Sequence, residues 1–261
     1  MTQENVPLPP HADRFHPNLA YGVTKFGFST IVNVYNYYNE ALFGDDFRSS
    51  AVVTLQFYDE RGRRRIDRGY RLPANGNLHI DLADELARSG ASEPAMGGVY
   101  VRLIPEQLPG RLTAKSISTE FTAEHINPAG FRDFMHNTSG PVLLPSLGHK
   151  RSEMLYADAS STPAYFVLIN TYLGPRIPLV SEGLARITIW NKAGQRVRAT
   201  SKTVPGGGTV LQSVSELFPD LQSFLNGEPG VIDFQTANLA RKPWIWYGSP
   251  DMNGDLCLEH V

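Results

Sequence analysis

The stretch VVTLQFYDERGRR, residues 52–64, sets the architecture, because it recurs 132 positions later as LARITIWNKAGQR, residues 184–196. Leu55 and Phe57 place apolar side chains at alternate positions, and matching isoleucines do the same in the second copy. This alternation is typical of a half-buried strand. In each copy the strand leads into a short segment that ends in glycine, which predicts the turn of a hairpin.

The match between the two copies continues past the hairpin at the same offset. LPANG at 72–76 aligns with VPGGG at 204–208, and this predicts a second turn in each copy. Asp81 and Ser213 follow, and each is a helix N-cap residue with a carboxylate three positions later. An offset held this long indicates a tandem duplication whose period is far longer than a solenoid repeat. We therefore expect an all-β protein of two tandem antiparallel β-sandwich domains, each with one short helix.

Proline-rich segments set the expected boundaries. Residues 1–20 contain four prolines and are predicted to be an extended N-terminal arm. Residues 21–121 form the first predicted sandwich. Residues 122–163 have no counterpart inside the repeat and are predicted to be a long irregular connection. Residues 164–261 form the second predicted sandwich with a C-terminal tail.

Composition limits the classes of partner. A net charge of −2 gives no basic footprint for nucleic acid, so no nucleic-acid partner is expected. No apolar run is long enough to cross a bilayer, and no signal peptide is recognised, so we expect no membrane insertion. The single cysteine, Cys257, excludes an internal disulfide framework and agrees with a reducing compartment. A soluble cytoplasmic protein is the expectation.

Three histidines in the predicted connection form the one constellation with metal-ligand chemistry. His125, His136 and His149 have carboxylates nearby, and neutral imidazole suits zinc, copper or iron. No two of them stand at the short separations that place two ligands on one face of a strand or helix. We therefore hold two interpretations, a transition-metal site and histidines that hydrogen-bond the connection into place, and we predict no other cofactor.

Aromatic residues offer a possible binding surface. Trp244 and Trp246 share one face of a predicted strand, where they could stack on a sugar ring or on a partner's side chain. Tyr37 and Tyr38 lie at the end of the strand-like run 21–38 of the first domain and are further candidates. Aromatic residues of this size also fill sandwich cores, and that alternative stays open here.

The sequence contains no recognised catalytic motif. It lacks the G-x-S-x-G elbow, the phosphate-binding loop with its Gly-Lys pair, and a G-x-G-x-x-G that opens a helix after a strand. We therefore predict no catalytic residue, and an enzyme is the less favoured expectation.

The order of motifs in each half resembles the small β-sandwich of the sensory rhodopsin transducer family. The resemblance rests on VTLQFYD (53–59), on LPA followed by Gly76, and on HIDLADEL (79–86). It implies jelly-roll-like or immunoglobulin-like sandwiches that act by binding, often as oligomers, with no catalytic residues to carry over.

Together these features predict a non-catalytic binding or assembly module. It would act through sandwich faces and loops on a protein or carbohydrate partner, and we expect a homo-oligomer. The alternative is a metal-binding protein or metal-dependent enzyme that uses the three histidines of 122–163.

Overall fold

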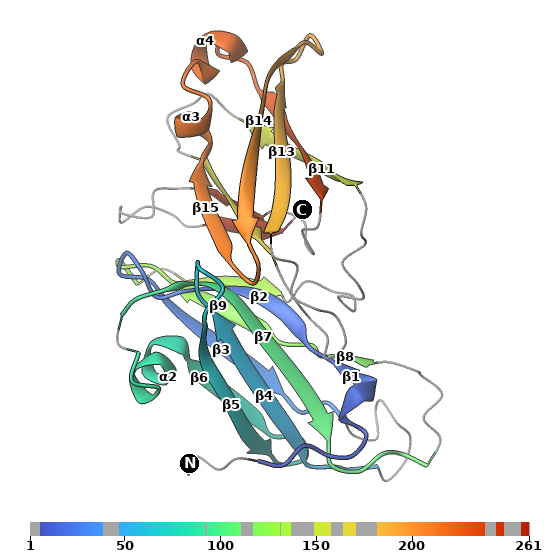
Figure 1. The fold of residues 1–261 in the computed structure, drawn as a ribbon. Helices are drawn as coiled ribbons and strands as arrows, with labels where there is room; N and C mark the ends of the chain where they lie inside the picture. Colours follow the sequence, from blue (N-terminus) through green and yellow to red (C-terminus); the bar gives the residue numbers. More distant parts are fainter. Residues whose placement is uncertain are drawn as a thin grey trace.

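The computed structural model of this chain is built almost entirely from antiparallel strands, which form two β-sandwich units (Figure 1). This confirms the all-β prediction. The structure describes residues 6–38, 47–91, 93–110, 117–130, 132–136, 149–157, 164–170, 182–237, 244–247 and 257–260.

The first unit contains the elements η1 to β10. In chain order they are η1 (Ala12–Arg14), β1 (Phe15–His16), β2 (Asn18–Val23), β3 (Ser29–Tyr35), β4 (Ala51–Tyr58), β5 (Arg64–Leu72), β6 (Asn77–Asp81), α2 (Leu82–Arg88), β7 (Met96–Pro105), β8 (Ile117–Ser118), β9 (Thr122–Ile126) and β10 (Arg132–His136). Its two main sheets have the strand orders β2-β7-β4-β5 and β10-β9-β3-β6. The short strands β1 and β8 pair separately and in parallel.

The second unit contains the elements β11 to β18. They are β11 (His149–Ala157), β12 (Ala164–Ile169), β13 (Glu182–Trp190), β14 (Arg196–Pro205), β15 (Thr209–Ser213), α3 (Val214–Leu217), α4 (Leu221–Leu225), β16 (Gly230–Ala237), β17 (Trp244–Tyr247) and β18 (Cys257–His260). Its two sheets have the orders β11-β16-β13-β14 and β15-β12-β17-β18. The second unit therefore has two short helices where one was predicted.

The two units repeat one strand order. The sheet β2-β7-β4-β5 corresponds strand for strand to β11-β16-β13-β14, and β10-β9-β3-β6 corresponds to β18-β17-β12-β15. Every one of these neighbouring pairs is antiparallel in both units. The two units therefore share one topology, and the tandem duplication stays a prediction.

The hairpin turns repeat in detail because their residues impose the same geometry. Asp59 and Asn191 each use the side chain to accept backbone N–H groups of the turn, at 2.8 to 3.0 Å. Gly62 and Gly194 end the two turns with φ of +74°, a left-handed conformation that glycine adopts without steric cost. The predicted hairpins are therefore present in both units.

A buried asparagine ties the two sheets of each unit together. The Asn36 side chain donates to the carbonyl oxygens of Ser49 at 2.8 Å and Pro73 at 3.0 Å. Asn170, its counterpart after β12, donates to Val204 O at 3.0 Å. These bonds satisfy the carbonyl groups of two loop residues in the first unit and of one residue of β14 in the second.

Capping residues begin the helix that follows in each unit. The carboxylate of Asp81 accepts from Ala83 N at 2.8 Å at the start of α2, and the hydroxyl of Ser213 accepts from Glu216 N at 3.4 Å at the start of α3. Both predicted N-caps are therefore present.

Each sandwich has its own apolar core between its two sheets. Val32 and Val34 on β3 face Leu55 and Phe57 on β4 across the first core, and all four are at most 1% exposed. Phe166 and Phe234 contact each other edge to face in the second core, with ring centroids 5.2 Å apart. Burial of one such side chain stabilises the fold by about 1.5–3 kcal/mol.

Two segments predicted to be irregular contain strands. The arm, 1–20, includes β1 and the first residues of β2, which pairs with β7 from Asn18 to Val23. The connection, 122–163, includes β9, β10 and β11. The prediction was wrong because it was based on the prolines. These residues lie before and between the strands and interrupt none of them. Most of these strands pair with segments far away in the sequence, whereas β10 pairs with the adjacent β9.

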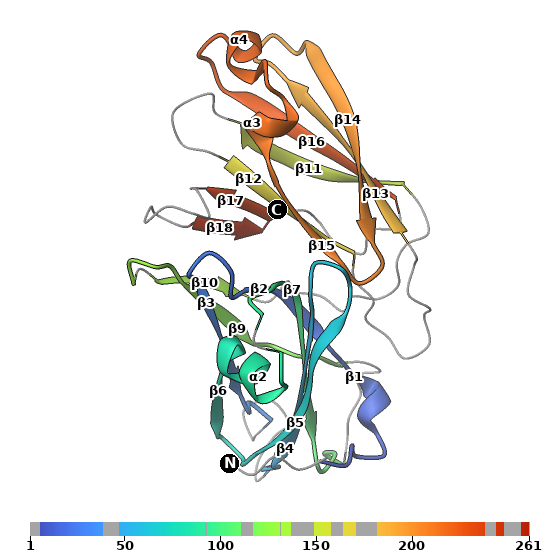
Figure 2. The same ribbon diagram turned by 60° about the vertical axis from the view of Figure 1, so that its left-hand side comes forward.

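The two units contact each other through the outer faces of two sheets. Leu19, Tyr21 and Tyr100 of the first unit pack with Val167 and Ile169 of the second in one buried cluster. In Figure 2 the sheet that carries β12 and β15 lies directly above β2 and β7. We call this set of five residues the inter-unit cluster.

The hairpin turns of the two units also meet at the edge of the inter-unit cluster. Thr209 N donates to Glu60 O at 3.1 Å. A methyl group added at Gly62 would lie 2.1 Å from Gly206 O, so glycine is needed for this approach. The turns therefore help to fix how the second unit sits on the first.

Within the described part of the chain, no helix has both the length and the apolar character needed to span a membrane.

Candidate functional site

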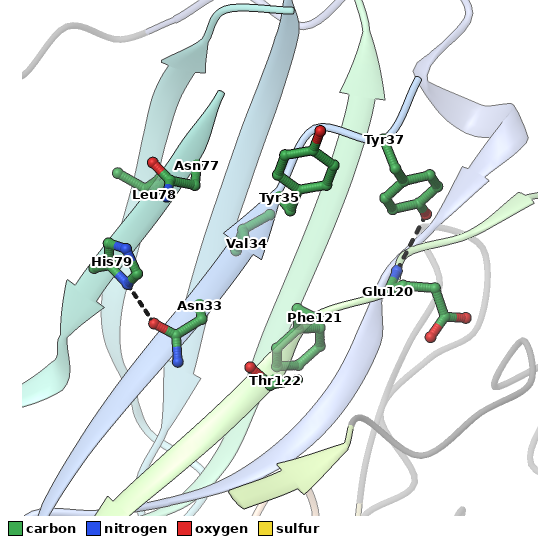
Figure 3. Close-up of a pocket in the computed structure, with 10 residues that line it drawn as sticks. All are labelled: Asn33, Val34, Tyr35, Tyr37, Asn77, Leu78, His79, Glu120, Phe121 and Thr122. Carbon is green, nitrogen blue, oxygen red and sulfur yellow. Dashed lines mark hydrogen bonds between the residues drawn. The ribbon is translucent and has the colours of Figure 1, made fainter. Parts of the chain in front are cut away.

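A groove of about 430 Å³ lies on the first unit, along β3, β6 and the segment that leads into β9 (Figure 3). Seven of its lining residues are exposed or partly exposed: Asn33, Tyr35, Tyr37, Asn77, His79, Glu120 and Thr122. The other three, Val34, Leu78 and Phe121, are at most 5% exposed and belong to the structural base of the groove.

Strand alternation presents the polar side chains to the groove. Along β3, Val32 and Val34 face the core, so Asn33 and Tyr35 between and beyond them face outward. The register then aligns Asn33 with His79 on β6 and with Thr122 on β9. These three residues therefore form one row across the outer face of the sheet β10-β9-β3-β6.

Asn33 and His79 are joined by a hydrogen bond that shows which atom of each side chain donates and which accepts. Nδ1 of His79 lies 2.5 Å from Oδ1 of Asn33, as Figure 3 shows. An amide oxygen can only accept, so Nδ1 of His79 carries the proton and donates. The amide nitrogen of Asn33 and Nε2 of His79 have no protein partner among the residues that the structure describes. The groove thus contains one hydrogen-bond donor and one acceptor that a ligand can use.

Two tyrosines line one end of the groove. The hydroxyl of Tyr37 accepts from Glu120 N at 3.2 Å, which ties the segment before β9 to the end of β3. Burial raises the pKa of Tyr37, so its hydroxyl is neutral at physiological pH. Tyr35 leaves 48% of its surface exposed and offers a ring face to a ligand.

The face around the groove has little uncompensated charge. Glu124 on β9 is paired with Arg132 on β10 at 2.6 Å, and Asp81 on β6 caps α2. Glu120 is the one carboxylate among the groove-lining residues. The arrangement therefore suits a ligand that is neutral and rich in hydrogen-bonding groups.

The equivalent face of the second unit has the opposite chemistry. Two positions are equivalent when they lie on corresponding strands and pair with corresponding residues. Asn33 pairs with His79 on β6, and its equivalent Val167 pairs with Leu211 on β15. We call Asn33, Tyr35 and His79 the polar set, and their equivalents Val167, Ile169 and Leu211 the apolar set. The apolar set packs in or against the inter-unit cluster, whereas the polar set lies on an open face.

The structure places the two tyrosines that the sequence pairs in different environments, although their rings are in contact. Tyr37 lines the groove, as a binding-surface residue would. Tyr38 is 0% exposed, and its hydroxyl donates to Leu103 O at 3.1 Å inside the first core. The expectation of Tyr38 at a binding surface is therefore wrong, because the chain turns inward after Asn36 and its side chain fills the sandwich.

Trp244 and Trp246 lie on β17, next to the apolar set. Their backbone positions pair with Val167 and Tyr165 on β12. Val167 is buried in the inter-unit cluster and Tyr165 packs against it. The side chains of both tryptophans lie outside the described part of the structure, so their role as a binding surface stays a prediction.

His125 is buried inside the first sandwich. Its side chain is 0% exposed, and Nδ1 lies 3.0 Å from Thr30 Oγ1. The Thr30 hydroxyl donates to Val23 O at 2.9 Å, so Nδ1 of His125 is the donor to Thr30. Burial lowers the pKa of His125 to about 4, which keeps the ring neutral at pH 7. These contacts agree with the second interpretation of the sequence, in which the histidine holds its segment in place by a hydrogen bond.

The other two histidines of the predicted metal site lie on different strands. His136 ends β10, where its Cα pairs with Thr122, and His149 begins β11 of the second unit, where its Cα pairs with Ala237. Their side chains fall outside the described residues. Among the residues that are described, no group of three His, Cys, Asp or Glu side chains could hold a metal ion. The metal site stays a prediction.

Sequence reasoning missed the polar set itself. Asn33 and Tyr35 looked like ordinary positions of a strand, and His79 entered only as part of a motif. The signal was available in the comparison of the two copies, since outward positions that are apolar in one copy are amide, phenol and imidazole in the other. Such a contrast points to different surroundings for the same face.

No protein-family model matches the chain, and no curated protein matches its sequence. The resemblance to the sensory rhodopsin transducer family stays a prediction.

Proposed function

We propose that this chain is a non-catalytic carbohydrate-binding module that holds a neutral sugar in the groove of the first unit. The observation that carries the proposal is the contrast between the polar set and the apolar set. In the second unit these outward positions pack against the first unit. In the first unit the same positions form an open surface with hydrogen-bonding groups.

The chemistry of the groove fits a sugar ring. A pyranose has an apolar C–H face and an equatorial belt of hydroxyl groups that both donate and accept. The half-exposed ring of Tyr35 can stack on the apolar face. The Asn33 amide nitrogen and Nε2 of His79 can donate to and accept from neighbouring hydroxyls.

The size and charge of the groove agree with this ligand. Its volume of about 430 Å³ falls in the range of small-molecule sites, about 300–1,000 Å³. Hydrolysis of a glycosidic bond generally needs two carboxyl groups on either side of the bond. Glu120 alone among the lining residues has one, which favours binding over hydrolysis.

Affinity electrophoresis tests the proposal. The full chain is run in native gels that contain hydroxyethyl cellulose, xylan, galactomannan or laminarin, and its mobility is compared with that in a gel without polysaccharide. We expect at least one polysaccharide to retard the wild type. Tyr35→Ala and His79→Ala should restore most of the lost mobility, because they remove the stacking ring and the acceptor.

Phe26→Ala is the matched control, because Phe26 is 45% exposed, close to the value for Tyr35, and does not line the groove. It should run like the wild type in every gel. Circular dichroism should show the same spectrum for all variants. Unchanged mobility of the wild type with all four polysaccharides would overturn the proposal, and so would equal retardation of the wild type and Tyr35→Ala.

A further inference from the structure

We infer that the bound carbohydrate is a linear chain that continues from the groove across the sheet to Phe134 on β10. This inference rests on the proposed function and names the class of ligand, an oligosaccharide or polysaccharide rather than a single sugar. Phe134 is 61% exposed, more than Tyr35, although it lies on a regular strand.

The register defines the path from the groove to this ring. Phe134 pairs with Glu124 on β9, and Glu124 pairs with Ile31 on β3. Tyr35 lies on the same strand as Ile31, four positions further on. From strand spacing and rise, the Cα atoms of Tyr35 and Phe134 are about 16 Å apart along a diagonal of the sheet. One hexose cannot reach that far, whereas a linear chain of about three or four rings can.

Both aromatic residues project from the same face of the sheet. Ile31 and Tyr35 are separated by an even number of positions and so point outward together. Directly paired residues on antiparallel strands also share a face, which places Phe134 on that side through Glu124. The two rings are therefore two stacking platforms on one surface.

The surface between the platforms is suited to a neutral chain. Ile31 and Thr122 are partly exposed and offer an apolar patch and a hydroxyl. The carboxylate of Glu124 is already bound by Arg132 at 2.6 Å and is 8% exposed. A neutral sugar chain can cross this pair without the loss of a charge interaction, whereas an acidic polymer would face Glu124 and Glu120.

Calorimetric titration with oligosaccharides of defined length tests the inference. The ladder, of two to six units, is the one that matches the polysaccharide that retards the chain: cello-, xylo-, manno- or laminari-oligosaccharides. We expect the affinity of the wild type to rise by about tenfold or more from the disaccharide to the tetrasaccharide, as the second ring is engaged.

Variants separate the two platforms. Phe134→Ala should lower the affinity for the tetrasaccharide about fivefold to tenfold and leave that for the disaccharide unchanged, since only the longer ligand reaches position 134. Tyr35→Ala should weaken both ligands, and Phe26→Ala should weaken neither. This pattern depends on chain length, so a general loss of folding cannot produce it.

The outcomes that overturn the inference are distinct from those that overturn the proposed function. Equal affinity for all chain lengths, or an unchanged tetrasaccharide affinity in Phe134→Ala, removes the second platform and leaves the groove as a sugar site. Absence of binding to every ladder and every polysaccharide overturns both. If Phe134→Ala instead changes only the elution volume in size-exclusion chromatography, the ring belongs to a contact between copies of the chain and the inference is wrong.

Discussion

Asn33 and Val167 occupy equivalent positions of equivalent strands in the two sandwich units, and they have opposite surroundings. Asn33 pairs with His79 and is partly exposed in the groove, whereas Val167 pairs with Leu211 and is 0% exposed against the first unit. The two residues show that one outward face is open and polar in the first unit and packs against the other unit in the second.

Exchange of these two residues should therefore have unequal effects. Val167→Asn should lower the free energy of unfolding by about 1–3 kcal/mol, because it buries an amide without a partner between the units. Asn33→Val should change it by less than about 0.5 kcal/mol, since the position is at the surface, but should abolish retardation in polysaccharide gels. Urea denaturation measures both changes, and equal destabilisation by the two variants would contradict the assignment of the faces.

Gly62 and Gly194 form a matched pair for the contact between the hairpin turns. Both have φ of +74°, so alanine costs about 1 kcal/mol at either position from the left-handed backbone alone. At Gly62 the new methyl group would also meet Gly206 O, whereas nothing lies within 4 Å at Gly194. Gly62→Ala should therefore lower the melting temperature clearly more than Gly194→Ala in differential scanning calorimetry. Similar melting temperatures would show that the turns do not help to hold the units together.

Acid should destabilise the protein through His125. Its pKa is about 4 in the folded protein, against 6.5 as the ordinary value. Between these values the unfolded chain takes up a proton that the folded protein does not, so stability is lost as pH falls from 6.5 towards 4 and not further below. Between pH 7 and 4.5 this linkage amounts to about 2 kcal/mol.

Urea denaturation of His125→Gln at pH 7 and pH 4.5 measures the contribution of His125 to the pH dependence of the unfolding free energy. The variant should lose less stability than the wild type over the interval, by about 2 kcal/mol. His79→Gln is the control, because it makes the same substitution at an exposed position. Identical pH dependence in His125→Gln and the wild type would mean that burial does not lower the pKa of His125.

The buried asparagines should matter for stability in both units. Asn36→Ala and Asn170→Ala each leave buried carbonyl groups without a donor, and we expect a loss of about 1–3 kcal/mol for each. Asn77→Ala, at an exposed position, should cost less than about 0.5 kcal/mol. Chemical denaturation of the three variants checks this order, and an Asn36→Ala variant as stable as Asn77→Ala would show that the bonds to Ser49 and Pro73 add nothing.

Local chemistry made several features predictable from the amino-acid sequence. Alternating apolar residues predict strands, a polar turn that ends at Gly62 or Gly194 predicts a hairpin, and Asp81 or Ser213 predicts a helix start. Each of these depends on residues a few positions apart, so it could be recognised without knowledge of the fold. The repeat of all of them at one offset also predicted that the chain has two similar halves.

Non-local contacts account for the errors. The first residues of β2 and the strands β9, β10 and β11 were not predicted because prolines surround them. The partners of β2, β9 and β11 are also distant in sequence, whereas β10 pairs with the adjacent β9. Tyr38 was predicted at a surface because no local pattern shows that its ring would fill the core. The groove was missed for the same reason, since Asn33, His79 and Glu120 come from three separate segments.

The amino-acid sequence alone was therefore enough for the all-β class, the two similar halves, the turns and the caps, because these depend on short-range sterics, hydrogen bonding and the period of the strands. Packing between the units determined which outward face became an interface and which became a groove. Strand alternation directs Asn33 and Val167 outward in the same way. Whether water or another sheet lies beyond them depends on the apolar surface that Leu19, Tyr21 and Tyr100 present from the other half of the molecule.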